Sequence, residues 1–456
     1  MTRTPGAAVL AEVAGAGHCT HPVVLSGETV DTETGEIRRS VLRIACKDRR
    51  STICPSCSYL YKTDAWILIS TGLVGGKGLP PDVLEHPKVF VTLTAPSFGA
   101  VHRRTDQGEC HPRARSPRCE HGHTTRCGAY HGDDDPMLGA PLCTDCFDYE
   151  GAVLWNATAS ALWHRTMVRL RQGIAATQHL TETRLLQVAR LNYLKVAEFQ
   201  RRGLVHFHVV LRADGPDGAG SPSPEWLTTE VLAHQLGHLV RHMAYRAPSG
   251  VTVSWGERLT ITDLAARDGD GRRVTAYLAK YATKSTDGSV AFARRFQERG
   301  QIERAPVHDH ARRLALTAWD LGGHDELGEE RLQRHAHSFG FTGQLITKSQ
   351  GFSTTFTALR GARASHMAGL HESTAMALGT FRYAGRGYSD PRGEVVAELL
   401  HEATVELHQV ARERRVAALR DSRNRSRDGS RDRSHSSRDG SRDRSRAVAE
   451  RDADPQ

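Results

Sequence analysis

The sequence has 456 residues, of which 39% are hydrophobic and 25% are charged, and its formal net charge is +9. This length exceeds what one ordinary hydrophobic core organises, so we expect two or three folded units with polar tails. The positive charge favours a polyanionic partner, and the lack of a secretory leader or a membrane-length apolar run favours a cytoplasmic protein. In that reducing compartment, the nine cysteines are better explained as metal ligands than as a disulfide framework.

The first 82 residues form a cysteine-bearing region. Two of its cysteines have the Cys-x-x-Cys spacing of a zinc knuckle, which is a strong signal in a reducing compartment. Four thiolates fill a tetrahedral zinc site and leave no open position, so this zinc is expected to be structural. The candidate ligands are Cys19, Cys46, Cys54 and Cys57.

Regular elements follow in the middle of the chain. A helix is predicted around Asp64–Gly72, and the apolar run Val89–Thr94 predicts a buried strand that ends at Ala95-Pro96. A second helix is predicted over Leu154–Ala176, and a third over Thr228–Tyr245.

A polar insertion at residues 103–150 is dense in cysteine and histidine, and we expect metal ions to hold it together. Our preferred partition leaves Cys110 unassigned, with His111, His121 or His123 able to replace one cysteine. The rival partition is a single zinc site formed by the two Cys-x-x-Cys pairs, Cys54 with Cys57 and Cys143 with Cys146. The preferred zinc ligands of the insertion are Cys119, Cys127, Cys143 and Cys146.

Two strand-like runs, Leu186–Phe199 and Leu204–Leu211, are joined by a short polar turn that predicts a hairpin. Alternation places His206 and His208 on one face, and a turn at Arg201-Arg202 sets Glu198 opposite His206. Two imidazoles and a carboxylate suit Mg²⁺ or Mn²⁺ better than a closed zinc cage. The alternative is a pair of ordinary strand histidines.

A helix is predicted over Arg273–Thr283 and carries the segment Tyr277-Leu-Ala-Lys-Tyr281-Ala-Thr-Lys284. At helical spacing, both phenols and a lysine share one face. A phenol beside a lysine and a metal-polarised phosphate is able to attack phosphorus. The alternative reading makes both tyrosines half-buried core residues.

The region 305–363 suggests no chemistry, and the Arg-rich tail is either a non-specific contact for nucleic acid or a solvated low-complexity segment. Residues 305–363 read as a further folded region, and a helix is predicted over Glu394–Arg415. The segment Ser426–Ser434 is repeated identically at Ser437–Ser445, and with so few apolar residues to bury, the tail is expected to be disordered.

These motifs occur in a recognisable order: Thr92-Leu-Thr94, then His206-Phe-His208, then Tyr281-Ala-Thr-Lys284. The chain resembles the rolling-circle replication initiators of the HUH endonuclease superfamily. Its segments Cys54–Cys57, Thr92–Gly99 with Val101-His102, Asp148–Asn156 and Ala279–Lys284 are similar to those of the RepSA-like initiators of actinobacterial plasmids. The resemblance spans roughly residues 19–363. It implies an α+β fold in which a central antiparallel sheet with flanking helices, similar to a ferredoxin or RRM fold, forms the endonuclease core.

The resemblance also implies a mechanism. His206 and His208 become the metal ligands, Tyr281 the primary nucleophile, Tyr277 a second one, and Lys284 the residue that positions the phosphate. The enzyme nicks a single-stranded or cruciform plasmid origin, keeps the 5′ phosphate on tyrosine, and leaves a 3′ hydroxyl primer. A host helicase and a DNA polymerase are candidate partners.

Two other functional classes remain open at this point: another HUH enzyme, such as a transposase or relaxase, and a non-enzymatic zinc-containing DNA-binding regulator. From the N-terminus, the expected domains are a cysteine-rich region at 1–82, the endonuclease with its insertion at 83–290, a folded region that is a candidate for DNA binding at 291–370, a helical extension at 371–415, and the tail at 416–456.

Overall fold

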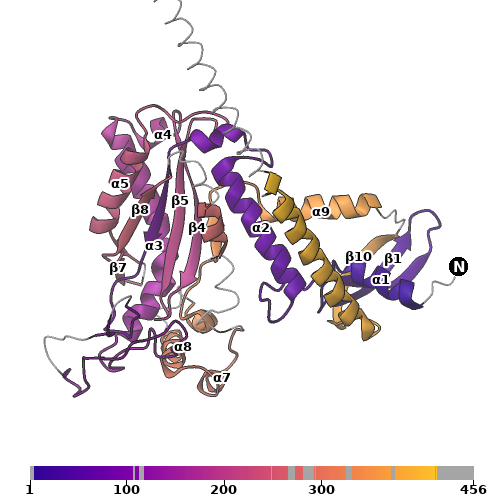
Figure 1. The fold of residues 1–456 in the computed structure, drawn as a ribbon, viewed down its shortest axis with the longest axis horizontal. Helices are drawn as coiled ribbons and strands as arrows, with labels where there is room; N and C mark the ends of the chain where they lie inside the picture. Colours follow the sequence, from indigo (N-terminus) through magenta and orange to yellow (C-terminus); the bar gives the residue numbers. More distant parts are fainter. Residues whose placement is uncertain are drawn as a thin grey trace, which may run out of the picture. The chain divides into compact units, whose positions relative to one another are not determined.

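The structure is a computed structural model that describes residues 5–105, 108–111, 118–247, 249–264, 273–280, 292, 294–324, 331–370, 375–415 and 417–418. These residues divide into two compact units. One takes its described residues from 1–46, 54–56 and 374–456, and the other takes them from 47–53 and 57–373. The expected α+β class is confirmed, because helices combine with antiparallel sheets (Figure 1).

The larger unit is built on a five-stranded antiparallel sheet with the order β8-β3-β5-β4-β9. Its central strand β5 pairs with β4 on one side and with β3 on the other. The strands are β3 (Lys88–Leu93), β4 (Arg190–Phe199), β5 (Val205–Asp214), β8 (Leu259–Asp263) and β9 (Ile346–Lys348).

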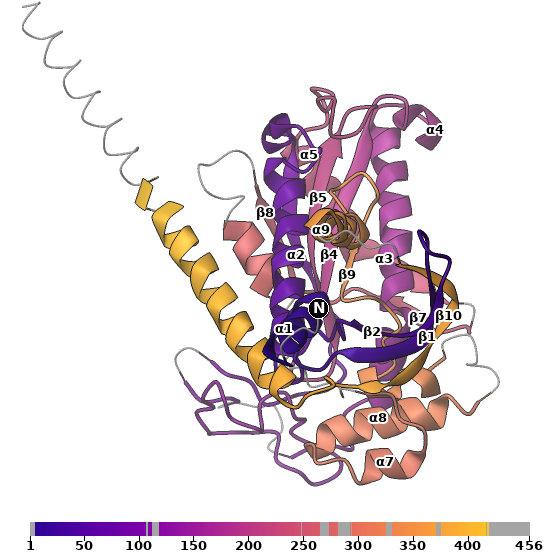
Figure 2. The same cartoon turned by 90° about the vertical axis from the view of Figure 1, so that its right-hand side faces the viewer.

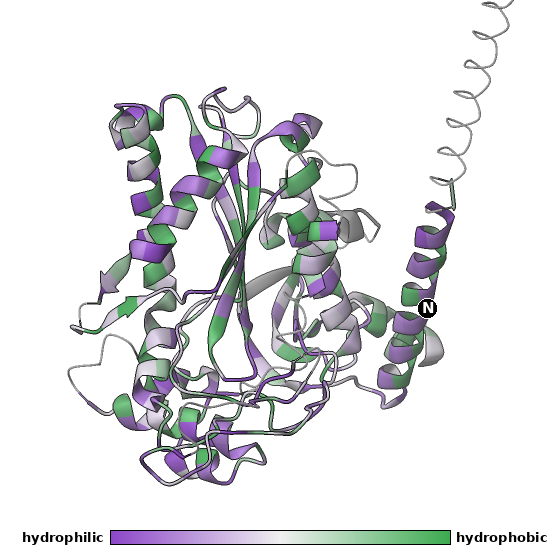
Figure 3. Cartoon of the chain, turned by 60° about the vertical axis from the view of Figure 1, so that its left-hand side comes forward, coloured by the Kyte–Doolittle hydropathy of each residue, from purple (hydrophilic) through white to green (hydrophobic). Residues whose placement is uncertain are grey.

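Helices cover both faces of this sheet (Figures 1 and 2). On one face, β5 side chains such as Phe207 and Val209 join a large core with α3 (Tyr149–Thr177) and α5 (Thr229–His242). On the other, Val210 packs with a smaller core of α2 (Pro55–Val74) and residues 273–280. In Figure 3, hydrophobic and hydrophilic residues alternate along the helices, and α5 buries one face through Leu232, Leu236 and Val240.

The long helices begin where local chemistry favours a start. The side chain of Asp148 accepts a hydrogen bond from the backbone N–H of Gly151 and caps α3. Thr228 accepts from the N–H of Val231 and caps α5. Pro55 stands at the first position of α2, where its missing N–H costs nothing.

Shorter elements complete the larger unit. They are η1 (Pro81–Glu85), α4 (Glu182–Leu185), β6 (Ala244–Arg246), β7 (Thr252–Ser254), α7 (Arg299–Glu303), α8 (Asp309–Leu321), η3 (Gln333–Ser338) and α9 (Phe356–Leu370). The hairpin β6-β7 holds Tyr245, which the sequence had placed in a helix.

A buried ionic network occupies the end of the sheet that carries Arg212. This guanidinium is fully buried, binds Asp214, and donates to the backbone carbonyl of Gly72 at the end of α2. Asp214 also accepts from His86 at 2.6 Å and from Asn192 at 2.6 Å. The network therefore ties a helix to the sheet through groups that satisfy one another's charge.

The smaller unit is a three-stranded antiparallel sheet, β10-β1-β2, with α1 (Pro5–Gly15) and a helix over residues 392–415. Its strands are β1 (Val23–Asp31), β2 (Ile37–Ile44) and β10 (Ala375–Arg386). Val9 and Val13 of α1 pack with Ala397.

The division of the chain differs from the expected one in two respects. The expected helical extension at 371–415 begins with strand β10, and only its second half is helical. That extension joins the N-terminal residues in one unit, whereas most of α2 belongs to the other. The predicted tail from residue 419 onward lies outside the described residues, and so does Thr283, the predicted end of one helix.

Among the helices that the structure describes, none is both long enough and apolar enough to cross a membrane.

Candidate functional site

The β4-β5 hairpin sets the register of the candidate site. Its turn closes with hydrogen bonds from the N–H of Gln200 to the carbonyl of Leu204 and from the N–H of Gly203 to the carbonyl of Gln200. Gly203 has a φ of +77°, and a Cβ there would meet a Leu314 methyl carbon at 2.1 Å, so only glycine fits. Glu198 then pairs with His206, which confirms the predicted opposition.

Three ligand atoms converge on this face of the hairpin. One carboxylate oxygen of Glu198 lies 2.8 Å from Nε2 of His206 and 3.5 Å from Nε2 of His208. The three side chains are 10%, 15% and 2% exposed, in the same order, so the site is shielded but reachable through His206. Neighbouring ligands of a six-coordinate ion at about 2.1 Å are about 3 Å apart, which these distances fit.

The β3 strand holds His208 in place. The hydroxyl of Thr92 lies 3.2 Å from Nδ1 of His208, which leaves Nε2 facing Glu198. The ring of Phe90 stacks on the imidazole with centroids 6.0 Å apart. Burial lowers the pKa of His208, although the hydrogen bond with Glu198 opposes that shift. The imidazole therefore favours its neutral form, which is the form that binds metals.

Tyr277 lies beside the same imidazole. Its ring meets both His208 and Phe90 edge-on, with centroids 5.4 Å apart in each case. Its helix is anchored by buried Leu278 and Ala279, whereas Tyr277 itself is 39% exposed. The structure therefore brings Tyr277 together with the predicted metal ligands. Tyr281 and Lys284 lie outside the described residues.

Hydrogen bonds from α3 and to the segment after β3 hold the β4-β5 hairpin in place. The buried side chain of Asn156 on α3 donates to the carbonyl of Gly203 at 2.9 Å and accepts from the N–H of Val205 at 3.0 Å. Arg202 donates to the carbonyls of Ala95 and Pro96 just beyond β3. These bonds fix the strand ends around the triad before any metal binds.

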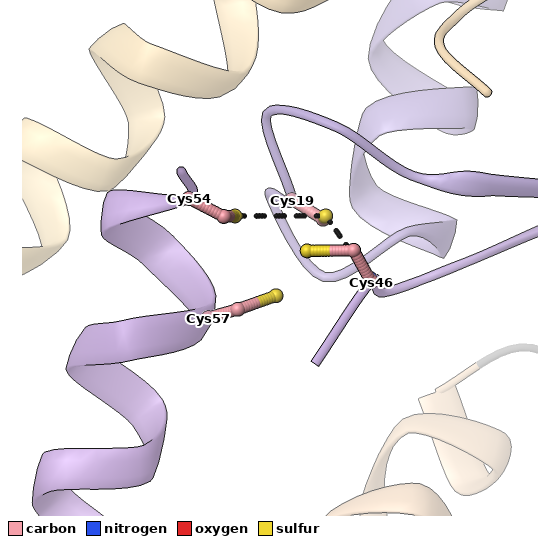
Figure 4. Close-up of side chains that lie close together, drawn as sticks. All are labelled: Cys19, Cys46, Cys54 and Cys57. Atoms are coloured by element: carbon pink, nitrogen blue, oxygen red, sulfur yellow. Dashed lines mark hydrogen bonds between the residues drawn. The ribbon is translucent and has the colours of Figure 1, made fainter. Parts of the chain in front are cut away.

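The N-terminal cysteines also come together, with their sulfur atoms turned toward one another (Figure 4). The Sγ atoms of Cys19 and Cys54 are 3.7 Å apart, close to the roughly 3.8 Å edge of a four-thiolate zinc tetrahedron. The N–H of Cys46 donates to the sulfur of Cys19. Cys54 precedes α2 and Cys57 lies in its first turn, so the helix start presents both. The four residues fit a closed zinc site.

The insertion groups its ligands differently from the prediction. Cys119, Cys143 and Cys146 gather with His121, whose Nδ1 lies 3.3 Å from the sulfur of Cys146. Burial favours the thiol of Cys119, but hydrogen bonds from the N–H of His121 and from Cys146 outweigh it and lower its pKa to about 7. Cys127, expected in this set, lies in another group. The replacement of one cysteine by His121 was an alternative that the sequence had left open.

Sequence reasoning missed Thr92 as the residue that contacts His208. The signal was available, because Thr92 alternates with buried Val91 and Leu93 along a strand of the same sheet. It also left Cys110 without partners, although Cys110 belongs to a second cluster of the insertion, with His102, Cys127 and His131.

Comparisons with known proteins agree on one family. The model of the RepSA family, described as "Replication initiator protein, pSAM2", matches residues 6–402. A replication initiator protein of Streptomyces ambofaciens is 37% identical over 438 residues, which cover 88% of this chain and 90% of that protein. No solved structure matches the chain.

Proposed function

The chain belongs to the RepSA family of replication initiator proteins, and on that premise we propose that it nicks a plasmid origin as a metal-assisted HUH endonuclease. One observation carries this proposal. Glu198, His206 and His208 direct their ligand atoms to one point on a rigid hairpin, with Tyr277 packed against His208. A phenol beside an open two-histidine, one-carboxylate site is suited to phosphoryl transfer.

The donor set fits Mg²⁺ or Mn²⁺, held by Glu198, His206 and His208. When bound, such an ion withdraws charge from a phosphate oxygen and makes phosphorus more electrophilic. Thr92 keeps the Nε2 atom of His208 directed at the site through its contact with Nδ1. Because these side chains stand on paired strands, little reorganisation is needed before reaction.

In the proposed step, the phenolate oxygen of Tyr281 forms a bond to phosphorus while the bond from phosphorus to the 3′ oxygen breaks. The 3′ oxygen takes up a proton and becomes the primer hydroxyl, and the 5′ end stays linked to tyrosine. Lys284 contributes positive charge toward the phosphate. Tyr277, beside His208, is the second phenol, which serves the transfer that closes the circle.

The substrate is then the double-strand origin of a rolling-circle plasmid, exposed as a single strand or a cruciform loop. A host polymerase extends the 3′ hydroxyl, with a host helicase opening the duplex. Zinc at the Cys119 cluster supports the fold of the insertion, and zinc at Cys19, Cys46, Cys54 and Cys57 supports the fold of the N-terminal region. A transposase or relaxase would share the chemistry, but membership of an initiator family favours replication.

The test is a covalent adduct. Full-length protein is incubated with Mn²⁺ and single-stranded origin oligonucleotides that tile the plasmid origin, and a 5′ adduct that survives denaturation is measured. We expect Tyr281→Phe and His208→Ala each to slow its formation by at least about 10³-fold. His238→Ala, on the exposed side of α5, is the matched control and leaves the rate unchanged.

Two outcomes would contradict the proposal. If no origin sequence yields an adduct with the wild-type protein, the endonuclease assignment fails and a DNA-binding regulator is favoured. If Tyr277→Phe abolishes the adduct while Tyr281→Phe keeps it, the order of the two tyrosines is reversed.

A further inference from the structure

A third group of metal-ligating side chains lies in the insertion, apart from the two cysteine-rich clusters. Its ligand atoms all lie within 4.8 Å of one another. Nδ1 of His102 lies 3.1 Å from Nε2 of His131 and 3.9 Å from the sulfur of Cys110, and the sulfur of Cys127 lies 3.5 Å from Nε2 of His131. The four members are His102, Cys110, Cys127 and His131.

These separations match a tetrahedron. Zinc binds nitrogen at about 2.0 to 2.1 Å and sulfur at about 2.3 Å, so the ligand atoms of a two-cysteine, two-histidine site are about 3.3 to 3.8 Å apart. The three measured distances, 3.1, 3.5 and 3.9 Å, lie within or close to this range. His131 and Cys110 are almost fully buried, whereas a surface cluster of chance contacts would be solvated.

The surroundings of the ligands point independently to a metal. Nδ1 of His131 contacts the carboxylate of Asp135 at 2.6 Å, which leaves Nε2 to face the other three ligands. This is the carboxylate–histidine arrangement that orients ligands in zinc proteins. The backbone N–H of Arg103 donates to the sulfur of Cys110 at 3.1 Å, as expected where a thiolate needs stabilisation.

We propose that His102, Cys110, Cys127 and His131 hold a third structural Zn²⁺ in this chain. Four protein ligands fill the tetrahedron, so the ion has no open position for a substrate. The assignment does not depend on the endonuclease activity, because it rests on residues outside the triad.

The position of this site indicates what the zinc stabilises. Within the described residues of 101–147, the backbone forms only turns and isolated bridges, so regular hydrogen bonding does not hold the segment. Yet the segment contacts the β4-β5 turn, where Arg201 donates to the backbone carbonyls of Asp133 and Asp135. Gly139 packs so closely on Arg201 that a Cβ would overlap its backbone. Zinc therefore fixes a loop that supports the hairpin carrying Glu198 and His206.

The experiment counts zinc ions in the purified full-length protein. We expect three per chain in the wild type and two in His131→Ala. His111→Ala is the matched control and retains three: Nδ1 of His111 lies 3.0 Å from the sulfur of Cys110, but His111 is not a member of the converging group. The proposal is overturned if His131→Ala holds as many ions as the wild type, or if His111→Ala loses one ion and His131→Ala none.

A second measurement avoids the risk that a variant fails to fold. The wild-type protein is loaded with ¹¹³Cd²⁺, whose NMR shift depends on the number of sulfur ligands. We expect three resonances, for sites with four, three and two sulfurs. Only two resonances, without the two-sulfur signal, would refute the third site whatever the variants do.

Discussion

The triad on the hairpin and the clusters of the insertion bring their ligands together by different physical means. Glu198, His206 and His208 stand on paired strands, and backbone hydrogen bonds set their spacing without a metal. The insertion has only turns and isolated bridges among its described residues, so its ligands meet across loops. The triad is organised by the fold, whereas we propose that bound zinc organises the loops of the insertion.

This difference matches the chemistry expected of each. A site that acts on a phosphate needs open positions and ligands that stay in place when the ion exchanges. A closed zinc site needs no open position and no ligands held in place beforehand, because the binding free energy of the ion itself contributes to folding. The first prediction tests whether the two regions differ in this way, and the other two test how the strands hold His208 and Lys195.

Metal removal is expected to have the largest effect. Treatment with a strong zinc chelator should raise amide hydrogen exchange across residues 118–147 by about 10³-fold or more, because structural zinc contributes several kcal/mol to local order. Exchange in β4 and β5 should change little near their centres. The measurement is hydrogen exchange followed by mass spectrometry.

Equal acceleration in β4 and β5 would contradict the distinction, since the sheet would then depend on zinc as well. Removal of Mg²⁺ or Mn²⁺ alone serves as the control, and it should leave exchange in the insertion unchanged.

The second prediction concerns the orientation of His208. Thr92→Val keeps the shape of the side chain but removes the oxygen that lies 3.2 Å from Nδ1. We expect the apparent affinity for Mn²⁺, measured from adduct formation, to fall about 10- to 100-fold. Thr92→Ser should restore it, and the unfolding midpoint should stay close to that of the wild type. A Val variant with wild-type Mn²⁺ dependence would show that β3 does not position the ligand.

The third prediction concerns Lys195, on the face of β4 opposite Glu198. Its Nζ lies 3.8 Å from the ring centroid of Phe207, and burial lowers its pKa to about 7. In the unfolded chain the pKa is about 10.4, so between these values the unfolded state binds one more proton. The free energy of unfolding should therefore rise with pH from about 7 to about 10.

Lys195→Met removes this dependence. We expect it to stabilise the protein by about 2 to 4 kcal/mol at pH 7, with a gain that shrinks toward pH 10. Urea unfolding at pH 7 and pH 9 measures the difference. A gain that is equal at both pH values would exclude the proton on Lys195 as its cause.

The strand predictions agree with the structure, apart from the start of β4 at Arg190 and not at Leu186, because they rest on local periodicity. Alternation alone placed His206 and His208 on one face, and symmetry about the turn placed Glu198 opposite His206. The helix starts were less well defined, since α2 begins at Pro55 and not near Asp64. Strand β10 was missed within a region expected to be helical.

The local sequence did not predict which cysteines share a cluster. The pairs Cys54 and Cys57, and Cys143 and Cys146, were visible as Cys-x-x-Cys motifs. The same reasoning grouped Cys127 with Cys143, although Cys127 lies beside His131 and Cys110. Spacing does not encode which distant loop segment supplies the remaining ligands.

The sequence by itself therefore determined the types of the candidate ligands, the α+β class and the register of the β4-β5 hairpin, because residue type and a period of two act over a few neighbouring positions. Only the tertiary structure decided that Thr92 faces His208, that Tyr277 packs beside it, and how the insertion divides its ligands. Those contacts join residues far apart in the chain, and their geometry depends on strand order and loop paths that no local pattern specifies.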